Sequence, residues 1–392
     1  MIEAPVISTC HQKAPATELA FGDEALQCLE RSVSCARAYW RMFLEETPSV
    51  LAPNLDARVG VVRTSERVWP LSVHEGEGEL SYPCSLVTQY VRCPLAELAL
   101  VKPPWARAGA WAALHGLGAL LGATAVDRTV QWSSGLLSTN LHGPGLLEDA
   151  AAVTALLVEA FPEHAVLLKN IHGYEDPGLP ARLEALGYTL ITSRLIYFFD
   201  GKQAEFMMRS DVKRDLKALK TLNEYSIVNH ENFTMEDMPR ITELYAKLYL
   251  DKHSRLNPQY TEIFVGRAWK ERLLEFKGLR HESGRLDAVY ACYRLGGVTS
   301  TPFIGYDTSL PGQPGFYRLL VAMLLRDVAD AKLLLNYSSG AGEFKRRRGG
   351  VSALEWNAVY TRHLSAKKRM TYRILGGALN RFGRRFLEEN NV

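Results

Sequence analysis

The chain has 392 residues, of which 47% are apolar and 23% charged, and its formal net charge is +3. These values are typical of a globular protein and exclude a fibrous or fully disordered chain. The length favours two domains of about 200 residues. The 6 cysteines form no CxxC pair and have no histidine at ligand spacing, which indicates reduced thiols and no metal site.

The first half interleaves helical and strand-like apolar patterns up to a polar turn at Asp200-Gly201-Lys202. We expect helices at 23–46, 94–100, 106–121, 147–161 and 180–186. We expect strands at 58–63, 68–74, 125–133, 165–170 and 189–199. This order predicts a mixed α/β fold, with one module at 1–200 and another at 201–392.

The second half repeats the same style. Helices are expected at 211–222, 235–252, 258–276, 315–331 and 365–386. Strands are expected at 226–230, 286–295, 298–307, 333–338 and 353–361. Gly296-Gly297 between two apolar runs is a strong hairpin signal. The shared order of elements suggests a duplication at the level of the fold.

No segment has the length and apolar character of a membrane span, and the N-terminus lacks the pattern of a signal peptide. The nearest candidate is the Ala- and Leu-rich run from Ala106 to Val126. It carries Arg107, His115 and several glycines, so we expect a buried helix there. We therefore predict a cytoplasmic location without integral membrane insertion.

Charge is concentrated between Lys345 and Arg385, where twelve residues are basic and only Glu355 is acidic. The rest of the chain sums to 3 − 11 = −8. Such a stretch suits a polyanion: the phosphates of a cofactor, a nucleic acid or an anionic lipid surface. It follows a strand that runs into a glycine-rich turn at 337–344, a place where phosphates are often held. The alternative is a solvated helix face.

The second half, from about Phe199 to Arg369, resembles the GNAT acyltransferase superfamily, and more closely its branch of Fem-type aminoacyl transferases. The segments that carry the likeness are 244–249, 252–258, 286–307, 314–320 and 337–345. The first half is similar in outline to the first of two such modules, chiefly at 69–73 and 190–199. The resemblance implies an α/β fold of two GNAT-like mixed-sheet modules in tandem.

In that superfamily two adjacent strands splay apart and offer main-chain groups to an acyl donor. The next helix points its positive N-terminus at the donor's phosphates. The usual turn, Arg/Gln-x-x-Gly-x-Gly/Ala, is altered here because Pro314 lacks an N–H and an aromatic residue replaces a small one. A loop without a ligand is the alternative. The residues implied to bind the donor are Gly312, Gln313, Gly315, Tyr317 and Arg318.

Acyl transfer to an amine needs a neutral amine, a stabilised oxyanion and a proton for the leaving group. Tyr306 and Asp307 end the second central strand, so we expect either to accept a proton or to anchor the substrate, with a turn cap as the alternative for Asp307. Ser338 can bind a substrate carbonyl or phosphate, or cap the strand end. Glu355 either pairs with an arginine or acts as general base.

Two further groups complete the predicted site. In Fem-type proteins a lysine at the place of Lys345 faces a phosphate, and Arg346 and Arg347 adjoin it. The residues predicted to bind the acceptor are Lys252, His253, Asn257 and Tyr260, which cluster between two helices. For His253 a purely structural role is the alternative.

Together these features predict a transferase that forms an amide between an activated acyl donor and a small amine or amino-acid-like acceptor. Aminoacyl-tRNA is slightly favoured over acyl-CoA as co-substrate because twelve basic residues exceed what CoA requires. No tightly bound cofactor is expected. The alternatives are an acyl-CoA-dependent N-acetyltransferase and a non-catalytic module that binds RNA or a membrane surface.

Overall fold

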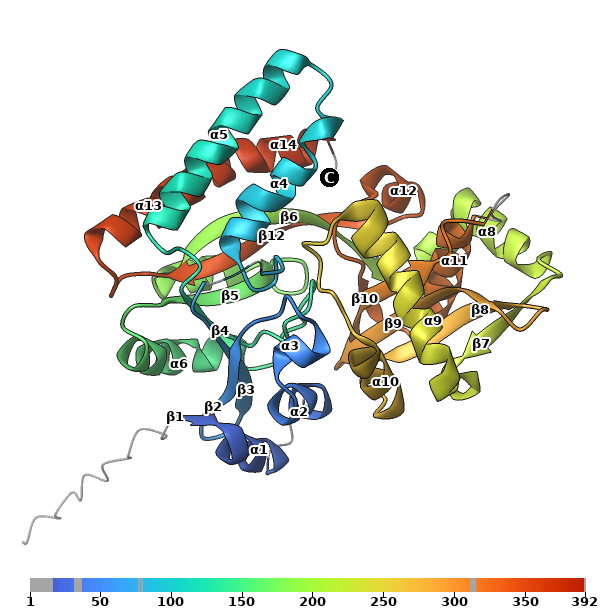
Figure 1. Cartoon of the computed structure of the whole chain (residues 1–392), viewed down its shortest axis with the longest axis horizontal. Coiled ribbons are helices and arrows are strands. Elements are labelled where there is room, and N and C mark those ends of the chain that lie inside the picture. Colours follow the sequence, from blue (N-terminus) through green and yellow to red (C-terminus); the bar gives the residue numbers. More distant parts are fainter. Residues whose placement is uncertain (1–16, 32–36, 77, 79, 311–314, 391–392) are drawn as a thin grey trace, which may run out of the picture.

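The computed structural model describes residues 17–31, 37–76, 78, 80–310 and 315–390, and its centre is one twelve-stranded mixed sheet (Figure 1). The strand order is β1-β2-β3-β4-β5-β12-β6-β11-β10-β9-β8-β7. The strands are β1 Glu18–Phe21, β2 Arg58–Arg63, β3 Val68–His74, β4 Thr129–Trp132, β5 Ala165–His172, β6 Thr189–Asp200, β7 Tyr225–Asn229, β8 Glu275–His281, β9 Leu286–Leu295, β10 Val298–Tyr306, β11 Leu334–Asn336 and β12 Val351–Tyr360.

Helices cover both faces of this sheet. The α-helices are α1 Gly22–Glu30, α2 Arg37–Glu45, α3 Pro48–Leu51, α4 Cys93–Ala96, α5 Pro104–Ala123, α6 Leu146–Ala160, α7 Leu179–Ala185, α8 Ser210–Lys220, α9 Met238–Tyr245, α10 Glu262–Lys270, α11 Phe316–Asp330, α12 Gly342–Arg347, α13 Ala366–Ala378 and α14 Arg384–Asn390. The π-helical segments are η1 Thr88–Arg92, η6 Ala246–His253 and η7 Leu379–Gly383, and short 3₁₀ turns are η2 Leu98–Leu100, η3 Glu205–Met208, η4 His230–Asn232 and η5 Met235–Asp237.

The two halves of the chain repeat one arrangement. In the first half, the parallel strands β4 and β5 are joined through α6, and α7 and β6 follow. In the second half, the parallel strands β10 and β11 are joined through α11, and α12 and β12 follow. The last strand of each half pairs with the other half, because β6 lies against β11 and β12 lies against β5. The halves therefore complete each other's sheet by exchanging strands.

The strand exchange bears on the predicted modules. The mixed α/β class and the repeated order of elements are confirmed. The boundary near residue 200 stays a prediction, but β12 from beyond it pairs on both sides with strands of the first half.

Most predicted strands and helices are present, and the differences have local causes. The helix predicted at 258–276 is present but shorter. It is α10, Glu262–Lys270; Arg272 then takes a left-handed φ of 53°, and β8, which was not predicted, starts at Glu275. The helix predicted at 23–46 is divided into α1 and α2, with 32–36 outside the described residues. The sequence pattern did not predict β1. The Gly296-Gly297 hairpin is confirmed, with Gly296 at a φ of 60°.

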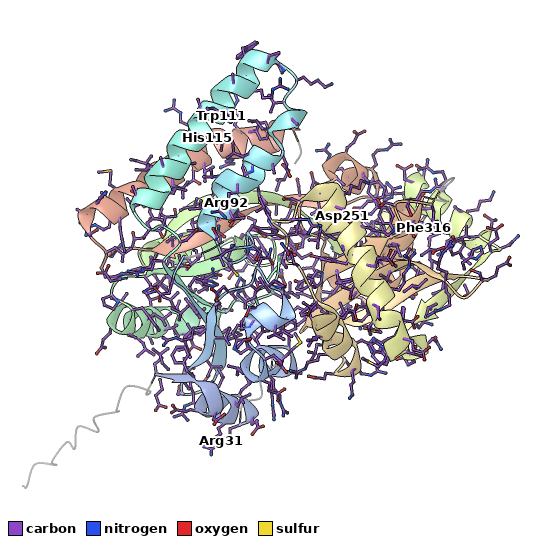
Figure 2. The ribbon with its side chains drawn as sticks, in the orientation of Figure 1. Arg31, Arg92, Trp111, His115, Asp251 and Phe316 are labelled. Atoms are coloured by element: carbon purple, nitrogen blue, oxygen red, sulfur yellow. The ribbon has the colours of Figure 1, made fainter. Side chains whose placement is uncertain are left out.

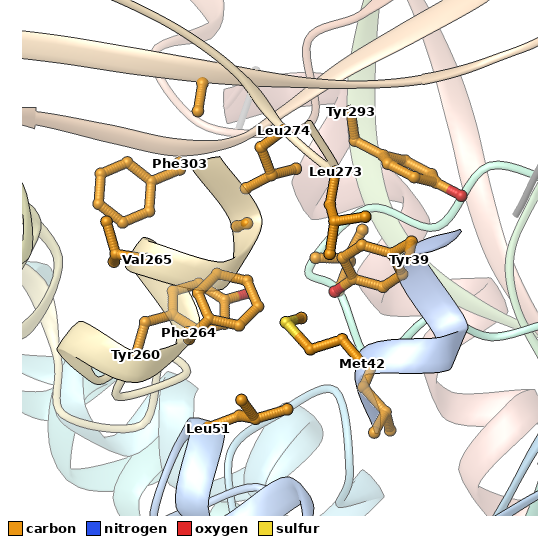
Figure 3. Packing of buried hydrophobic residues seen from close by; sticks show 14 of the residues in the cluster. Tyr39, Met42, Leu51, Tyr260, Phe264, Val265, Leu273, Leu274, Tyr293 and Phe303 are labelled. Carbon is orange, nitrogen blue, oxygen red and sulfur yellow. The ribbon is translucent and has the colours of Figure 1, made fainter. Parts of the chain in front are cut away.

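One hydrophobic cluster joins the two halves (Figure 3). Tyr39 and Met42 of α2 and Leu51 of α3 face Phe264 of α10 and Tyr293 of β9. The rings of Tyr39 and Tyr293 lie 5.1 Å apart between centroids. Burial of each side chain of this size contributes about 1.5–3 kcal/mol to the free energy of unfolding. The cluster therefore strongly stabilises the contact between the two halves.

We expect fragments 1–200 and 201–392 to fail to fold when each is produced alone. The second fragment would leave β12 without both neighbours, and each fragment would expose its part of the shared core. Co-production should restore a complex with one cooperative transition, measured by circular dichroism during thermal unfolding. A cooperative transition of fragment 201–392 alone, at the midpoint of the full chain, would contradict this expectation.

Candidate active site

The parallel strands β10 and β11 part soon after they meet. They pair at only three positions, the last between Ser300 and Asn336. The chain after β11 then turns to β6, where the Tyr337 amide donates to the Tyr197 carbonyl at 2.8 Å. Strand β10 runs on to Tyr306 without a strand partner on this side among the described residues. We call this parting the strand fork, and it is the splayed strand pair that the resemblance implies.

The shape of β10 has a cause in its sequence. The register with β9 shifts between Ser300 and Phe303, so Thr301 and Pro302 form a β-bulge. A bulge bends its strand and interrupts pairing, and proline has no N–H to offer to a neighbour. Farther on, a Cβ at Gly305 would lie 2.6 Å from the main chain of Leu244, so glycine is required for α9 to pack there.

Two unsatisfied polar atoms lie at the apex of the strand fork. The Ser300 Oγ and the Asn336 Nδ2 are buried and have no hydrogen-bond partner in the described part of the chain. Both residues are fully inaccessible, and they are register partners. Buried polar groups are nearly always hydrogen-bonded, so this pair is a place where a polar group of a ligand would be satisfied.

Tyrosine hydroxyls surround the fork. The hydroxyls of Tyr317 and Tyr337 lie 3.4 Å apart, and the Lys252 Nζ lies 3.3 Å from the Tyr306 hydroxyl. Burial raises the pKa of Tyr249, and the nearby Tyr317 hydroxyl raises it further. Burial also raises the pKa values of Tyr317 and Tyr337. The hydroxyls of Tyr249, Tyr317 and Tyr337 therefore stay protonated at neutral pH and can donate hydrogen bonds.

The first turn of α11 carries the guanidinium of Arg318. Gly315, the residue before the helix, has a φ of 75°, and a Cβ there would lie 2.9 Å from the Arg318 Nε. The guanidinium therefore folds back over the first turn, and its Nε is buried without a partner in the described residues. A guanidinium beside a helix N-terminus favours an anion. Gly312 and Gln313 lie outside the described residues.

Lys345 is buried and shapes the loop after β11. Its ammonium donates to the carbonyl oxygens of Tyr337, Ser338 and Ser339 at 2.7, 3.2 and 2.7 Å. Burial, and secondarily the charge of Arg194, lower the pKa of Lys345 to about 7. Its three hydrogens are committed to protein carbonyls, which leaves none for the phosphate contact that the resemblance implied.

The basic stretch does not form one surface. Arg347 pairs with Asp211 and Arg348 with Asp215, both on α8, whereas Arg346 lies against the Tyr197 hydroxyl. Strand β12 then runs into the other half of the molecule. Most of the remaining basic residues of the stretch lie there, on α13, η7 and α14. The central strand β12 therefore separates two parts of the basic stretch, and the binding of a polyanion by either part stays a prediction.

A buried ion pair lies where the exchanged strands meet. Arg194 of β6 and Glu355 of β12 are register partners, with Nε–Oε1 and Nη2–Oε2 distances of 2.9 and 3.0 Å. Glu355 also accepts from Asn170 and Ser193. Burial raises the pKa of Glu355, but Arg194 and these hydrogen bonds outweigh that effect and leave it below its ordinary value. Pairing with an arginine is confirmed. The same contacts do not favour Glu355 as a general base, because they stabilise its ionised form.

Arg194 also reaches the fork, and sequence reasoning missed it. Its Nη1 donates to the Ser338 Oγ at 3.2 Å, so Ser338, held at a φ of 55°, is linked to the ion pair. The available signal was a charged residue inside an apolar strand, since charged side chains are rarely buried unless paired. Ser338 stays a candidate for binding the substrate carbonyl.

Asp307 lies at the end of β10 but is not a suitable base. It pairs with Arg240 at 2.6 Å and with Lys247 at 3.2 Å, and it accepts from Ser309. Burial raises its pKa, but these hydrogen bonds bring the pKa well below the ordinary range. The prediction of Asp307 as proton acceptor does not fit this environment; its capping of Ser309 and its anchoring of α9 do.

The predicted acceptor group is divided. Lys252 reaches Tyr306 at the fork, and His253 is exposed on η6 beside Tyr249. Asn257 instead donates to main-chain carbonyls of its own loop, and Tyr260 is buried and stacked on Phe264 in the shared core. Only the first two residues of this group lie near the fork.

A separate groove of about 440 Å³ lies at the opposite end of β9 and β10, beside the C-terminal half of α11. Two ion pairs line it, Lys277 with Asp327 and Arg294 with Glu275. Glu231 and Asp330 add acidic side chains to the lining, so the groove suits an anion less well than the fork with Arg318 does.

The comparisons with known proteins agree with this geometry. Residues 207–346 match the family model described as an acetyltransferase (GNAT) domain, which is 140 of 392 residues. This segment contains the strand fork and α11. No curated protein matches the chain. The resemblance to the GNAT superfamily is confirmed.

Solved structures extend the likeness to the whole chain. The crystal structure of FemX has a TM-score of 0.51 at 6% identity and covers 92% of this chain and 100% of its own. A tandem GNAT protein from the clavulanic acid biosynthesis pathway has a TM-score of 0.41 at 12% identity, with 88% and 98% covered. L-PGS from Bacillus licheniformis has a TM-score of 0.42 at 15% identity, with 58% and 79% covered. At these identities the likeness concerns the fold alone, a mixed α/β fold with a GNAT-type domain at residues 207–346.

Replacing Arg194 by Met should lower the free energy of unfolding by about 3–5 kcal/mol, because it leaves Glu355 buried and uncompensated. The double variant R194M/E355M should recover most of this loss. The matched control is Arg182→Met, whose exposed pair with Asp176 should contribute less than about 1 kcal/mol. Urea denaturation measures the free energy of unfolding of all three variants. Equal decreases for R194M and R182M would contradict the expectation.

The same carboxylate should govern stability in acid. Because its folded pKa lies below the unfolded value, Glu355 contributes stability that is complete above about pH 4.3 and is lost as the pH falls through the folded pKa. The stability difference between the wild type and Glu355→Gln should therefore shrink steadily below about pH 4.3. The midpoints of urea unfolding of the two proteins, from pH 7 down to pH 2.5, measure this stability difference. A difference that stays constant with pH would refute the contribution of ionised Glu355.

Proposed function

We propose that this chain transfers an acyl group from an activated, phosphate-bearing donor to a small amine or amino-acid-like acceptor, with formation of an amide. The observation that carries the proposal is the strand fork, with the unsatisfied Ser300 and Asn336 at its apex and the unsatisfied Arg318 at the start of α11. An extended amide-containing arm would lie along β10 as an added strand, and its phosphates would meet Arg318.

The residues around the fork supply what acyl transfer needs. The amine attacks the activated carbonyl directly, so no enzyme nucleophile is required. The protonated hydroxyls of Tyr317 and Tyr337 can donate a proton to the leaving group. The exposed side chain of His253 is partly desolvated where its ring lies beside Tyr249. This, and then the charge of Lys252, lower the pKa of His253, so the imidazole can accept the proton of the amine. Tyr306 and Lys252 would position the acceptor.

Two donors are compatible with this proposal. The fork favours acyl-CoA, whose arm contains amides and ends in phosphates. Aminoacyl-tRNA needs a broad cationic surface, for which α8 offers the exposed Lys213, Arg214, Lys217 and Lys220. Because half of the basic stretch lies away from the fork, we place acyl-CoA first and aminoacyl-tRNA second.

The test is transfer from labelled acyl-CoAs and labelled aminoacyl-tRNAs to a panel of amines by the full chain. We expect amide products with one donor class. The affinity of the chain for tRNA should fall steeply between low and physiological salt, whereas its affinity for CoA should change far less. Binding of a donor without any transfer across the panel would favour a non-catalytic module and reject the proposal.

Replacing Arg318 by Gln should raise the KM for the donor about tenfold with little change in kcat, because it removes one charge-assisted contact to a phosphate. The matched control is Arg326→Gln on the same helix, at the end away from Gly315. Steady-state kinetics at varied donor concentration measure both variants. An unchanged KM in R318Q would remove Arg318 from the donor site.

A further inference from the structure

Helix α5 is the element that departs most from its sequence-based prediction. The sequence predicts a buried helix, but only Leu121 of its twenty residues is buried. Trp105 is 80% exposed and Trp111 is 53% exposed. Figure 2 shows Trp111 and His115 on this helix, and their rings lie 3.9 Å apart between centroids. The helix therefore presents aromatic and small apolar side chains to the outside.

A basic helix lies in the same layer. Leu114 and Leu117 of α5 and Tyr372 and Leu375 of α13 belong to one hydrophobic cluster on the sheet. Figure 1 shows α5 beside α13 and α14. The two helices also touch at their ends, where the Lys367 Nζ donates to the carbonyl of Ala123 at 3.4 Å. Their outer faces therefore belong to one surface.

The outer side of α13 alternates apolar and basic residues. Met370 and Ile374 are 52% and 48% exposed, and Lys367 and Arg373 are exposed beside them. The spacing of these four residues follows one helical stripe. Like α5, α13 exposes apolar side chains of a kind that are normally buried against another surface.

The charge of this surface has one sign. No acidic residue occurs between Glu97 and Asp127, or between Glu355 and Glu388. From Ala366 to Leu387 there are seven basic residues and none acidic. Lys368 finds its partner, Glu163, outside both helices. We call the outer faces of α5 and α13 the α5–α13 surface.

We propose that the α5–α13 surface docks on an anionic membrane surface. A helix that lies in the membrane interface has an apolar face with tryptophan and lysine or arginine at its border, which is the composition found here. Anionic lipids attract each Lys or Arg near the surface. No helix in the described ranges has the length and apolar character needed to cross a bilayer, so the docking is peripheral.

Two other occupants fit less well. A nucleic acid would match the basic residues of α13 but would leave most of the apolar face of α5 uncovered. A second copy of the chain would bring two basic α13 helices toward each other, which like charges oppose. A lipid surface covers the apolar residues and neutralises the basic ones together.

The proposal is tested with the full chain and vesicles of phosphatidylcholine, with or without one quarter phosphatidylglycerol. We expect co-sedimentation with the anionic vesicles, and weaker binding at high salt. Lys367→Gln with Arg373→Gln should lower the partition coefficient about 25-fold, since each charge is worth about fivefold. Trp105→Ala with Trp111→Ala should also weaken binding and remove the blue shift of tryptophan fluorescence.

The matched control is Lys202→Gln with Lys332→Gln, two exposed lysines outside both helices, which removes the same charge elsewhere and should bind as the wild type does. Circular dichroism checks that each variant is folded. Absent or equal binding to the two vesicle types overturns the proposal. Binding of tRNA, lost in K367Q/R373Q and without vesicle binding, would assign the surface to RNA. A dimer that W105A/W111A dissociates, again without vesicle binding, would assign it to a second copy.

Discussion

The bidentate pair between Arg194 and Glu355 is the interaction on which the arrangement of the molecule depends. It joins β6 and β12, the two strands that the halves exchange, where Glu355 is fully buried and the Arg194 side chain is 17% exposed. A buried charge is tolerated only with a partner of good geometry, so the pair specifies one register between these strands. Since β6 also pairs with β11, that register determines where β11 ends and where the strand fork opens.

The same pair extends into the candidate site. Arg194 holds the Ser338 hydroxyl, and Lys345 holds the carbonyls of residues 337–339. Two buried cations therefore keep the chain after β11 turned away from β10. Leaving such carbonyls without donors would cost about 1–3 kcal/mol each, so the open fork is stabilised by contacts outside it. The strand fork and the α5–α13 surface lie on opposite halves of the sheet, on either side of this junction.

Sequence reasoning found part of the candidate site. The glycine turn and Arg318 could be predicted because a left-handed residue before a helix is a local feature, and Tyr306 could be predicted because it ends a recognisable strand. Asp307 and Glu355 were given roles as bases that the structure does not support. Their pKa values depend on Arg240 and Arg194, which lie 67 and 161 residues away in the chain. No local pattern contains those partners.

The sequence by itself determined the periodic elements, the Gly296-Gly297 hairpin and the repeated order of the two halves, because these follow from side-chain alternation and backbone freedom over a few residues. Only the tertiary structure decided that β6 and β12 are exchanged, that the basic stretch is divided between two surfaces, and that α5 faces outward. Each of these depends on which face of an element finds a partner far along the chain. An apolar helix has the same pattern whether a protein core or a lipid surface covers it.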